Sequence, residues 1–216
     1  MLLQPTLWRL LRFAFRLFYN PFAFTYDFVS ALVSRGHWRT WTRAAIPRIR
    51  GTRILELPCG TGNLLLDMQS AGYAPIGVDL STSMLNITRG KLQRNHASQP
   101  LVRARAQALP FPGGTFDSVV MTFPPGFISD LTALTEIRRV LDDRGRLIWV
   151  DGARFLKPGL WSRLVNRWIG FVGGETEYAL LMQQILERAN FNAQVEWVGD
   201  TESAVAVATA RKEIDG

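Results

Sequence analysis

Cysteine and histidine are scarce in this chain of 216 residues, which has one cysteine and two histidines. With Cys59 as its single thiol, the chain cannot form an internal disulfide, and a reducing compartment suits it. His37 and His96 stand far apart and provide no ligand spacing for a metal ion, so we expect no metal site.

Lysine is scarce too, because nearly all of the basic residues are arginine. The net charge of +7 would suit nucleic acid, an anionic membrane or an anionic substrate. The positive charge is spread along the chain, however, and no RNA-binding module is recognisable. We therefore expect no nucleic-acid partner.

Long apolar runs are missing as well, since no run reaches the roughly 20 residues that a membrane span requires. Residues 7–18 are interrupted by Arg9, Arg12 and Arg16, and the pattern of a signal peptide is not present. We expect a cytoplasmic protein.

Residues 6–19 are expected to form a helix with a wide apolar face and a narrow arginine stripe. Such a helix suits the inner face of an anionic membrane; the alternative is that it packs on the domain or on a second subunit, and the sequence assigns no oligomeric state.

Apolar residues are abundant, at 47% against 20% charged residues, which predicts a globular protein with a substantial core. Helices are expected within residues 21–50, and strands and helices alternate from residue 51 onward. The predicted strands are 53–57, 74–79, 101–105, 116–122 and 146–150, the last after a turn at 142–145, and the predicted helices are 63–71, 81–94 and 130–141. This alternation predicts an α/β fold with a mainly parallel sheet. A helix at 178–189 and strands at 193–198 and 204–210 predict a closing antiparallel hairpin.

The stretch RILELPCGTGN, residues 53–63, joins a predicted buried strand to a glycine turn. Gly60 and Gly62 allow the backbone to approach a ligand closely, but the third glycine of a dinucleotide-binding loop is absent. Glu56 would repel a pyrophosphate and attract an ammonium group. Asp79, which ends the next predicted strand, can accept hydrogen bonds from both hydroxyls of a ribose. An ammonium group and a ribose without phosphate between them describe S-adenosylmethionine.

Four motifs in this order resemble those of the class I S-adenosylmethionine-dependent methyltransferases: residues 56–62, 77–79, 108–111 and 115–117. The resemblance implies a Rossmann-like, seven-stranded, mainly parallel sheet with helices on both faces and a C-terminal antiparallel hairpin. It also implies S-adenosylmethionine as the cofactor. Residues 51–216 would form the methyltransferase domain, and residues 1–50 a helical cap that faces a membrane.

The resemblance assigns cofactor contacts to residues at the ends of the first four predicted strands. These residues are Glu56, Leu57, Pro58, Cys59, Gly60, Thr61, Gly62, Asp79, Leu80, Met84, Arg105, Ala106, Gln107 and Thr122. Pro58 replaces the first glycine of the family pattern, and we expect the loop to persist with greater stiffness. Arg105 replaces a carboxylate that often accepts a hydrogen bond from the adenine amino group. Arginine has no acceptor, so we expect Arg105 to lie flat on the adenine or point away, while the Ala106 N–H donates to the ring.

The acceptor is less well defined by the sequence. Phe123 stands where an N-P-P-[YF] motif would have its first residue, so methylation of DNA or of protein glutamine is not expected. Residues 26–27, 34–37 and 38–41 resemble the segment before the first strand in the ubiquinone/menaquinone biosynthesis methyltransferases. The chain lacks that group's Arg-Asn after the fourth strand.

From this resemblance we expect methyl transfer to a small hydrophobic, aromatic or lipid-like acceptor, such as a quinone precursor. His37 and Tyr26 precede the first strand, in a segment that roofs the pocket in the family, and are the candidates for removing an acceptor proton. Two alternatives remain open. Pro58 and Arg105 favour a cofactor-binding protein without catalysis, and charge alone favours an RNA methyltransferase.

Overall fold

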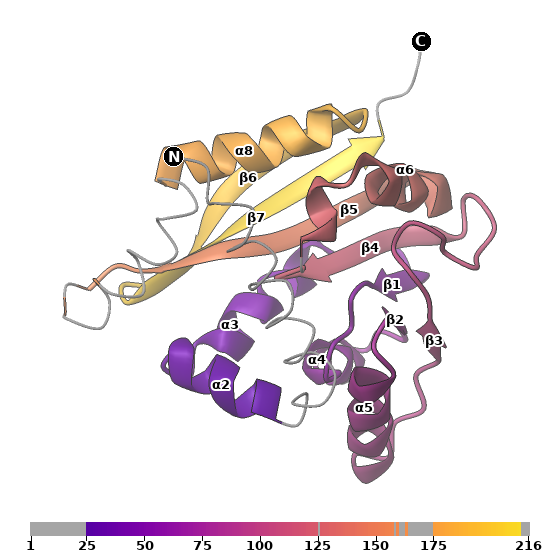
Figure 1. Ribbon diagram of the computed structural model, residues 1–216, viewed down its shortest axis with the longest axis horizontal. Helices are drawn as coiled ribbons and strands as arrows, with labels where there is room; N and C mark the ends of the chain where they lie inside the picture. The colour runs from indigo at the N-terminus through magenta and orange to yellow at the C-terminus, as the bar shows by residue number, and fades with distance from the viewer. Residues whose placement is uncertain (1–24, 125, 158, 160–162, 164–174, 213–216) are drawn as a thin grey trace, which may run out of the picture.

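The computed structural model describes residues 25–124, 126–157, 159, 163 and 175–212. The helix predicted at residues 6–19 lies outside these ranges. Within them, seven strands form one sheet in the order β3-β2-β1-β4-β5-β7-β6 (Figure 1). The strands are β1 (Ile54–Glu56), β2 (Ile76–Asp79), β3 (Leu101–Arg103), β4 (Phe116–Thr122), β5 (Leu141–Phe155), β6 (Phe191–Gly199) and β7 (Ser203–Lys212).

Strands β1 to β5 run parallel, and β7 is antiparallel to both β5 and β6. The predicted parallel sheet with a closing antiparallel hairpin is therefore confirmed. The strand order reverses at β1, which pairs with β2 on one side and with β4 on the other. Chains leaving β1 and β4 diverge at such a switch point, and ligands of α/β proteins bind in the resulting crevice.

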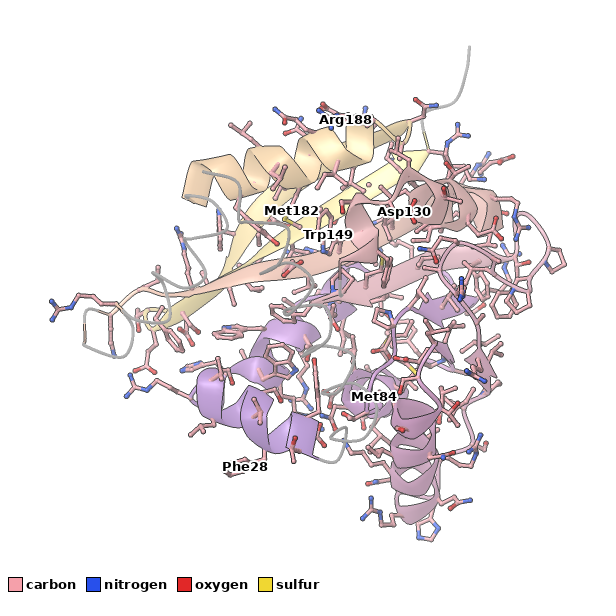
Figure 2. All side chains as sticks on the ribbon, viewed as in Figure 1. Phe28, Met84, Asp130, Trp149, Met182 and Arg188 are labelled. Atoms are coloured by element: carbon pink, nitrogen blue, oxygen red, sulfur yellow. The ribbon has the colours of Figure 1, made fainter. Side chains whose placement is uncertain are left out.

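Helices cover both faces of the sheet, as predicted (Figure 1). They are α2 (Tyr26–Val33), α3 (Trp38–Arg43), α4 (Asn63–Ser70), α5 (Thr82–Arg94), α6 (Leu131–Val140) and α8 (Glu175–Glu187), with short 3-10 helices η2 (Ile46–Arg48) and η3 (Phe127–Ser129). On one face the core joins the sheet to α6 and α8, where Trp149 and Met182 are buried (Figure 2). On the other face it joins the sheet to α3 and α4 around Trp41 and Leu64.

The sequence pattern explains why each element is buried as it is. In α6 the buried residues Ala133, Leu134, Ile137 and Val140 recur at helical spacing and form one stripe against the sheet. Strand β4 is buried on both faces, so its central residues form a continuous apolar run, as expected of a parallel strand between two neighbours.

Several predicted boundaries differ from those of the structure, and two of the differences change the interpretation. The turn predicted at residues 142–145 lies inside β5, because Phe116 pairs with Leu141 while Ser118 pairs with Arg146. The intervening residues form a bulge rather than an end of the strand. Strand β3 ends at Arg103 and not at residue 105, because Arg105 leaves the ladder and forms an isolated bridge with Ala108.

The described part of the N-terminal segment is tied firmly to the sheet. Trp41 is buried, and its indole N–H donates to Ser203 Oγ in β7 at 3.0 Å. Arg39 and Arg43 of α3 both donate to Asp67 Oδ1 of α4, at 2.5 and 2.7 Å. Burial raises the pKa of Asp67, but the two guanidinium groups outweigh it and lower the pKa. The division of the chain at residues 50 and 51 stays a prediction.

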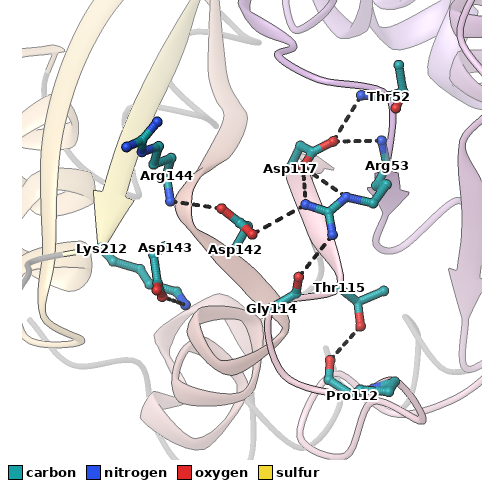
Figure 3. A network of polar contacts seen from close by, with 10 residues as sticks. All are labelled: Thr52, Arg53, Pro112, Gly114, Thr115, Asp117, Asp142, Asp143, Arg144 and Lys212. Carbon is teal, nitrogen blue, oxygen red and sulfur yellow. Dashed lines mark hydrogen bonds and ion pairs between the residues drawn. The ribbon is translucent and has the colours of Figure 1, made fainter.

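A polar network joins the amino ends of β1, β4 and β5 (Figure 3). Asp117 accepts from the backbone N–H groups of Thr52 and Arg53 at 3.0 Å, and the Arg53 guanidinium donates to Asp117 and to Asp142. Asp117 belongs to the fourth sequence motif. The network lies at the end of the strands opposite to Thr122, so Asp117 stabilises the start of the sheet and takes no part in the site.

Candidate cofactor and acceptor site

A cavity of about 770 Å³ opens at the carboxyl ends of β1 to β4, with residues of α2 and α3 on its other side. Most of the predicted cofactor residues line it: Glu56, Leu57, Pro58, Cys59, Gly60, Thr61, Asp79, Leu80, Arg105, Ala106, Gln107 and Thr122. Gly62 and Met84 do not line it. Gly62 precedes the first residue of α4, and Met84 is fully buried within the first turn of α5. The residues that the sequence motifs identified therefore lie together on one wall of this cavity.

The glycine turn after Pro58 places two glycines in the left-handed region of backbone conformation. Gly60 and Gly62 have φ of 52° and 78°, the left-handed region that favours glycine. A Cβ atom on Gly62 would lie 2.5 Å from Thr88 Cγ2, whereas one on Gly60 would meet nothing within 4 Å. Thr88 Oγ1 donates to the Gly60 carbonyl at 2.7 Å, which holds the turn against α5.

Asp79 is 6% exposed, and both of its oxygens are held by the backbone. Oδ2 accepts from the Gly60 N–H at 2.9 Å, and Oδ1 accepts from the Ser81 N–H at 2.8 Å. Burial raises the pKa of Asp79, and these two N–H groups oppose that effect. Because each carboxylate oxygen can accept two hydrogen bonds, the side chain keeps capacity for two hydroxyl groups in the cavity.

Glu56 is more deeply buried than Asp79 and, unlike Asp79, has an oxygen without a hydrogen-bond donor in the described part of the chain. It is 2% exposed, and its Oε2 atom has no hydrogen-bond partner among the described residues. Burial, and then the nearby carboxylates of Asp79 and Asp67, raise the pKa of Glu56 well above its usual range. A buried acceptor without a donor is costly. A cationic ammonium group in the cavity would supply the missing donor and lower that pKa.

Asp27 of α2 connects the N-terminal segment to the glycine turn. Its Oδ1 accepts from Thr61 Oγ1 at 2.6 Å and from Asn63 Nδ2 at 3.0 Å, and its Oδ2 accepts from Lys91 Nζ at 2.5 Å. Burial raises the pKa of Asp27, but the bonds from Lys91, Thr61 and Asn63 prevail and lower it. The Thr61 hydroxyl is therefore engaged by Asp27. Sequence reasoning noted Asp27 within a motif but missed these partners, which lie far along the chain.

The rim beyond β3 carries polar groups that surround the position expected for an adenine. Arg105, Ala106 and Gln107 line the cavity there. Arg103 also lines it, and its Nε donates to the Leu80 carbonyl at 3.1 Å. Gln107 Nε2 donates to Asp130 Oδ2 at 2.9 Å, a contact with the start of α6 that the sequence did not predict.

Aromatic rings form the opposite wall of the cavity. Trp38 stacks on Phe123, with ring centroids 4.3 Å apart and an interplanar angle of 26°. Tyr26 meets Trp38 edge to face at 6.1 Å, and Phe127 also lines the cavity. Phe123 follows β4 with φ of 46°. The sequence placed Tyr26 and the segment that contains Trp38 over the pocket, and it placed Phe123 at a family motif position after the fourth strand. It did not predict that Trp38 stacks on Phe123, and it did not single out Phe127.

Comparison with known proteins decides the family. Residues 54–145 match the model of a methyltransferase domain. The chain is 34% identical over 161 residues to the demethylmenaquinone methyltransferase of Symbiobacterium thermophilum, covering 66% of this chain and 62% of that protein. It is 30% identical over 185 residues to the ubiquinone/menaquinone biosynthesis C-methyltransferase of Bordetella avium, covering 77% of this chain and 71% of that protein. The chain belongs to the S-adenosylmethionine-dependent methyltransferase family.

The fold agrees with this membership. A crystal structure of an S-adenosylmethionine-dependent methyltransferase from Thermotoga maritima superposes with a TM-score of 0.63 at 20% identity, covering 91% of this chain and 98% of that one. The chain spans about three fifths of the length of the first relatives it matches.

The residues of this methyltransferase fit the cofactor of the family. The unpartnered Glu56 Oε2 has the chemistry to accept a hydrogen bond from an amino group, and the Asp79 carboxylate has the chemistry to accept from hydroxyl groups such as those of a ribose. Cys59 is buried at the base of the cavity, and burial, together with Glu56 and Asp79, raises the pKa of its thiol. A thiol held in its protonated form is a poor nucleophile, so Cys59 serves as a small buried side chain.

His37 lies away from the cavity of the methyltransferase. Its ring stacks on Trp41 with centroids 6.0 Å apart, its Nδ1 is 3.2 Å from Ser203 Oγ, and its Nε2 is 3.6 Å from Glu202 Oε2. The side chain faces the start of β7 and is not among the residues that line the cavity. Its role as a base stays a prediction that this geometry does not support.

Within the ranges that the structure describes, no helix is both long and apolar enough to cross a bilayer.

Proposed function

We propose that this protein transfers a methyl group from S-adenosylmethionine to a hydrophobic, aromatic acceptor such as a quinone precursor. The observation that carries the proposal is one continuous cavity with two unlike walls. Glu56 and Asp79 stand on the polar wall, and Trp38 and Phe123 stand on the aromatic wall. A charged cofactor and a flat apolar acceptor can therefore meet inside it.

The polar wall holds the cofactor in the proposed complex. Asp79 accepts from the ribose hydroxyls, and Glu56 receives the ammonium group, which gives its unpaired oxygen a donor. When bound, the cofactor supplies a methyl group already activated by the positive sulfur, which keeps the bonding electrons as the methyl group leaves. The protein therefore has to orient the two ligands and exclude water, and good orientation can contribute roughly 7–11 kcal/mol.

The aromatic wall holds the acceptor. Stacking against Trp38 and Phe123 suits a flat ring, and Tyr26 is the titratable side chain on this wall. Methylation of a ring carbon requires that the carbon lose its proton. We propose that Tyr26 orients the acceptor through its hydroxyl group and that the proton of the ring carbon passes to water, because a neutral phenol is not a base at neutral pH.

The names of the relatives favour one acceptor class. The curated relatives of this chain include a demethylmenaquinone methyltransferase and a ubiquinone/menaquinone biosynthesis C-methyltransferase. We therefore propose a ring of the demethylmenaquinone type as the acceptor, methylated on carbon.

The test uses the purified full chain with methyl-labelled S-adenosylmethionine and reduced demethylmenaquinone in detergent. We expect a labelled lipid product that has gained one methyl group. Trp38→Leu should raise the KM for the acceptor about two- to tenfold, because aromatic pairs contribute about 0.5–1.5 kcal/mol beyond their buried area. The same variant should bind S-adenosylhomocysteine as the wild type does.

Binding of S-adenosylhomocysteine without methylation of any lipid in an extract of the source organism would favour a protein that binds the cofactor without catalysis. Salt-dependent binding of RNA would favour the nucleic-acid alternative.

We also propose that the N-terminal region docks on an anionic membrane, with residues 6–19 as the main contact. Support comes from the outer face of α2, where Phe28 and Leu32 are 71% and 57% exposed (Figure 2). Arg35 is exposed just beyond that helix. Deleting residues 1–20 should abolish co-sedimentation with phosphatidylglycerol vesicles and leave cofactor affinity intact. Unfolding of the truncated protein would show that this region belongs to the core.

A further inference from the structure

Gln107 occupies a constrained position on the adenine side of the cavity. It lines the cavity beside Arg105 and Ala106, and its Nε2 donates to Asp130 Oδ2 at 2.9 Å. Asp130 lies at the start of α6 (Figure 2). Its other oxygen accepts from the Thr132 N–H at 3.0 Å and caps that helix. The Gln107 side chain is thus fixed at its amide nitrogen by a residue that is itself fixed by a helix.

The charge of Asp130 determines which way the Gln107 amide faces. The bond from Gln107, and then the Thr132 N–H, lower the pKa of Asp130, so this carboxylate is ionised at neutral pH. An ionised carboxylate only accepts hydrogen bonds. The amide must therefore present Nε2 to Asp130, and Oε1 points away from it. Among the described residues, Gln107 Oε1 has no protein partner.

Arg105 cannot serve as a hydrogen-bond acceptor on this rim, whereas Gln107 Oε1 can. Arg105 lines the same rim, but a guanidinium carries no acceptor and cannot receive a hydrogen bond from an amino group. A neutral carbonyl oxygen fixed in direction can. It would select a ring that carries an amino group over one that carries hydrogen or a carbonyl oxygen at the same position, because a misfit leaves polar groups unpaired.

We propose that Gln107 Oε1 accepts a hydrogen bond from the exocyclic amino group of the adenine of the cofactor, and that Asp130 is the positioning residue that orients it. This inference rests on the cofactor binding in the proposed function. It makes Gln107 a residue that determines the base specificity of the cofactor site and Asp130 a remote contributor to that specificity.

The test compares two ligands by calorimetry: S-adenosylhomocysteine and its analogue in which the 6-amino group is replaced by hydrogen. The wild type should bind the analogue about tenfold more weakly, since the analogue lacks one hydrogen bond and leaves the acceptor in the site unpaired. Gln107→Met keeps the length of the side chain and removes its acceptor. This variant should bind both ligands equally, at about the affinity that the wild type has for the analogue. A purely structural role would weaken both ligands by one factor and leave their ratio at tenfold, which would overturn the proposal.

Asp130→Asn tests the orientation separately. Asparagine caps a helix as well as aspartate does, so α6 should persist. Its amide can donate to Gln107 Oε1, which frees the Gln107 amide to turn over. The preference for S-adenosylhomocysteine should then fall below about threefold, by loss of one oriented hydrogen bond. A preference that stays at tenfold would show that Asp130 does not orient Gln107.

The outcomes separate this inference from the proposed function. Equal binding of the two ligands by the wild type overturns the inference alone. A tenfold preference without methylation of any acceptor leaves the inference in place and overturns the proposed reaction. Failure of the folded wild type to bind S-adenosylhomocysteine overturns both. If Gln107→Met does not fold, the wild-type ratio and Asp130→Asn still decide the matter.

Discussion

The two walls of the cavity are built in different ways. The polar wall consists of strand ends and backbone N–H groups, with Asp79 fixed by Gly60 and Ser81. The aromatic wall consists of side chains from separate segments, with Trp38 of α3 stacked on Phe123 after β4. Substitution of side chains changes the shape of a wall made of backbone very little. In a wall made of stacked rings, replacing one ring changes the shape of the surface. This difference suits a constant cofactor on one side and an acceptor that differs between relatives on the other.

The glycine turn that supports the polar wall should tolerate substitution least at Gly62, which lies behind the cavity lining, and Gly62→Ala tests this. The new Cβ would lie 2.5 Å from Thr88 Cγ2, and the residue would need φ of 78°. We expect a loss of about 2–4 kcal/mol in the free energy of unfolding, from the left-handed backbone and the overpacking. Gly60→Ala is the matched control, because it shares the positive φ but has open space at its Cβ. It should lose about 1–2 kcal/mol in urea denaturation. Equal losses would show that the contact with Thr88 adds nothing.

The next largest effect should come from Asp79→Ala. The substitution removes the acceptor proposed for the ribose and releases the Gly60 N–H. We expect the affinity for S-adenosylhomocysteine to fall by about 1–3 kcal/mol in calorimetry, because both losses involve hydrogen bonds to a charged group. Trp38→Leu, on the aromatic wall, serves as the control and should leave this affinity unchanged. A loss in both variants would mean that the two walls are not independent.

Glu56 should make the free energy of unfolding depend on pH. Its pKa is raised in the folded protein, so above the unfolded value of 4.5 the folded state binds more protons than the unfolded state. Stability without cofactor therefore falls as the pH rises from 4.5 toward the folded pKa. Glu56→Gln removes this contribution. The slope of unfolding free energy against pH should differ between the two proteins by about 1 kcal/mol per pH unit. Parallel slopes immediately above pH 4.5 would contradict the assignment.

The smallest effect is expected from Arg105→Asp, at the edge between the two walls. The substitution introduces the carboxylate acceptor that the family often has at this position. Cofactor affinity should stay the same or rise by less than about 1 kcal/mol, because Gln107 provides an acceptor already. A tenfold loss in calorimetry would show that Arg105 contacts the cofactor or holds the rim.

The sequence predicted the polar wall well because its residues follow one another at the ends of successive strands. Glu56 and Asp79 could be placed from hydrophobic runs and glycines alone, and the parallel sheet brings their strand ends to one edge. The same reasoning missed the bulge in β5, because Asp142 and Gly145 have the composition of a free turn.

The aromatic wall could not be predicted, because its contacts join residues that no local pattern relates. Nothing in the sequence pairs Trp38 with Phe123, and His37 was placed near the cavity only because its segment was expected to cover it. In the structure the ring of His37 turns toward Ser203 and Glu202, residues at the far end of the chain. Side-chain direction within a short helix depends on tertiary packing, which a single sequence does not reveal.

Asp27 has a consequence for how the N-terminal segment is attached to the rest of the molecule. Its carboxylate holds Thr61, Asn63 and Lys91 at once, so a single side chain joins α2 to the glycine turn and to α5. Separating α2 from the turn would leave all three groups without this partner. The free energy that attaches α2 is therefore concentrated at one carboxylate.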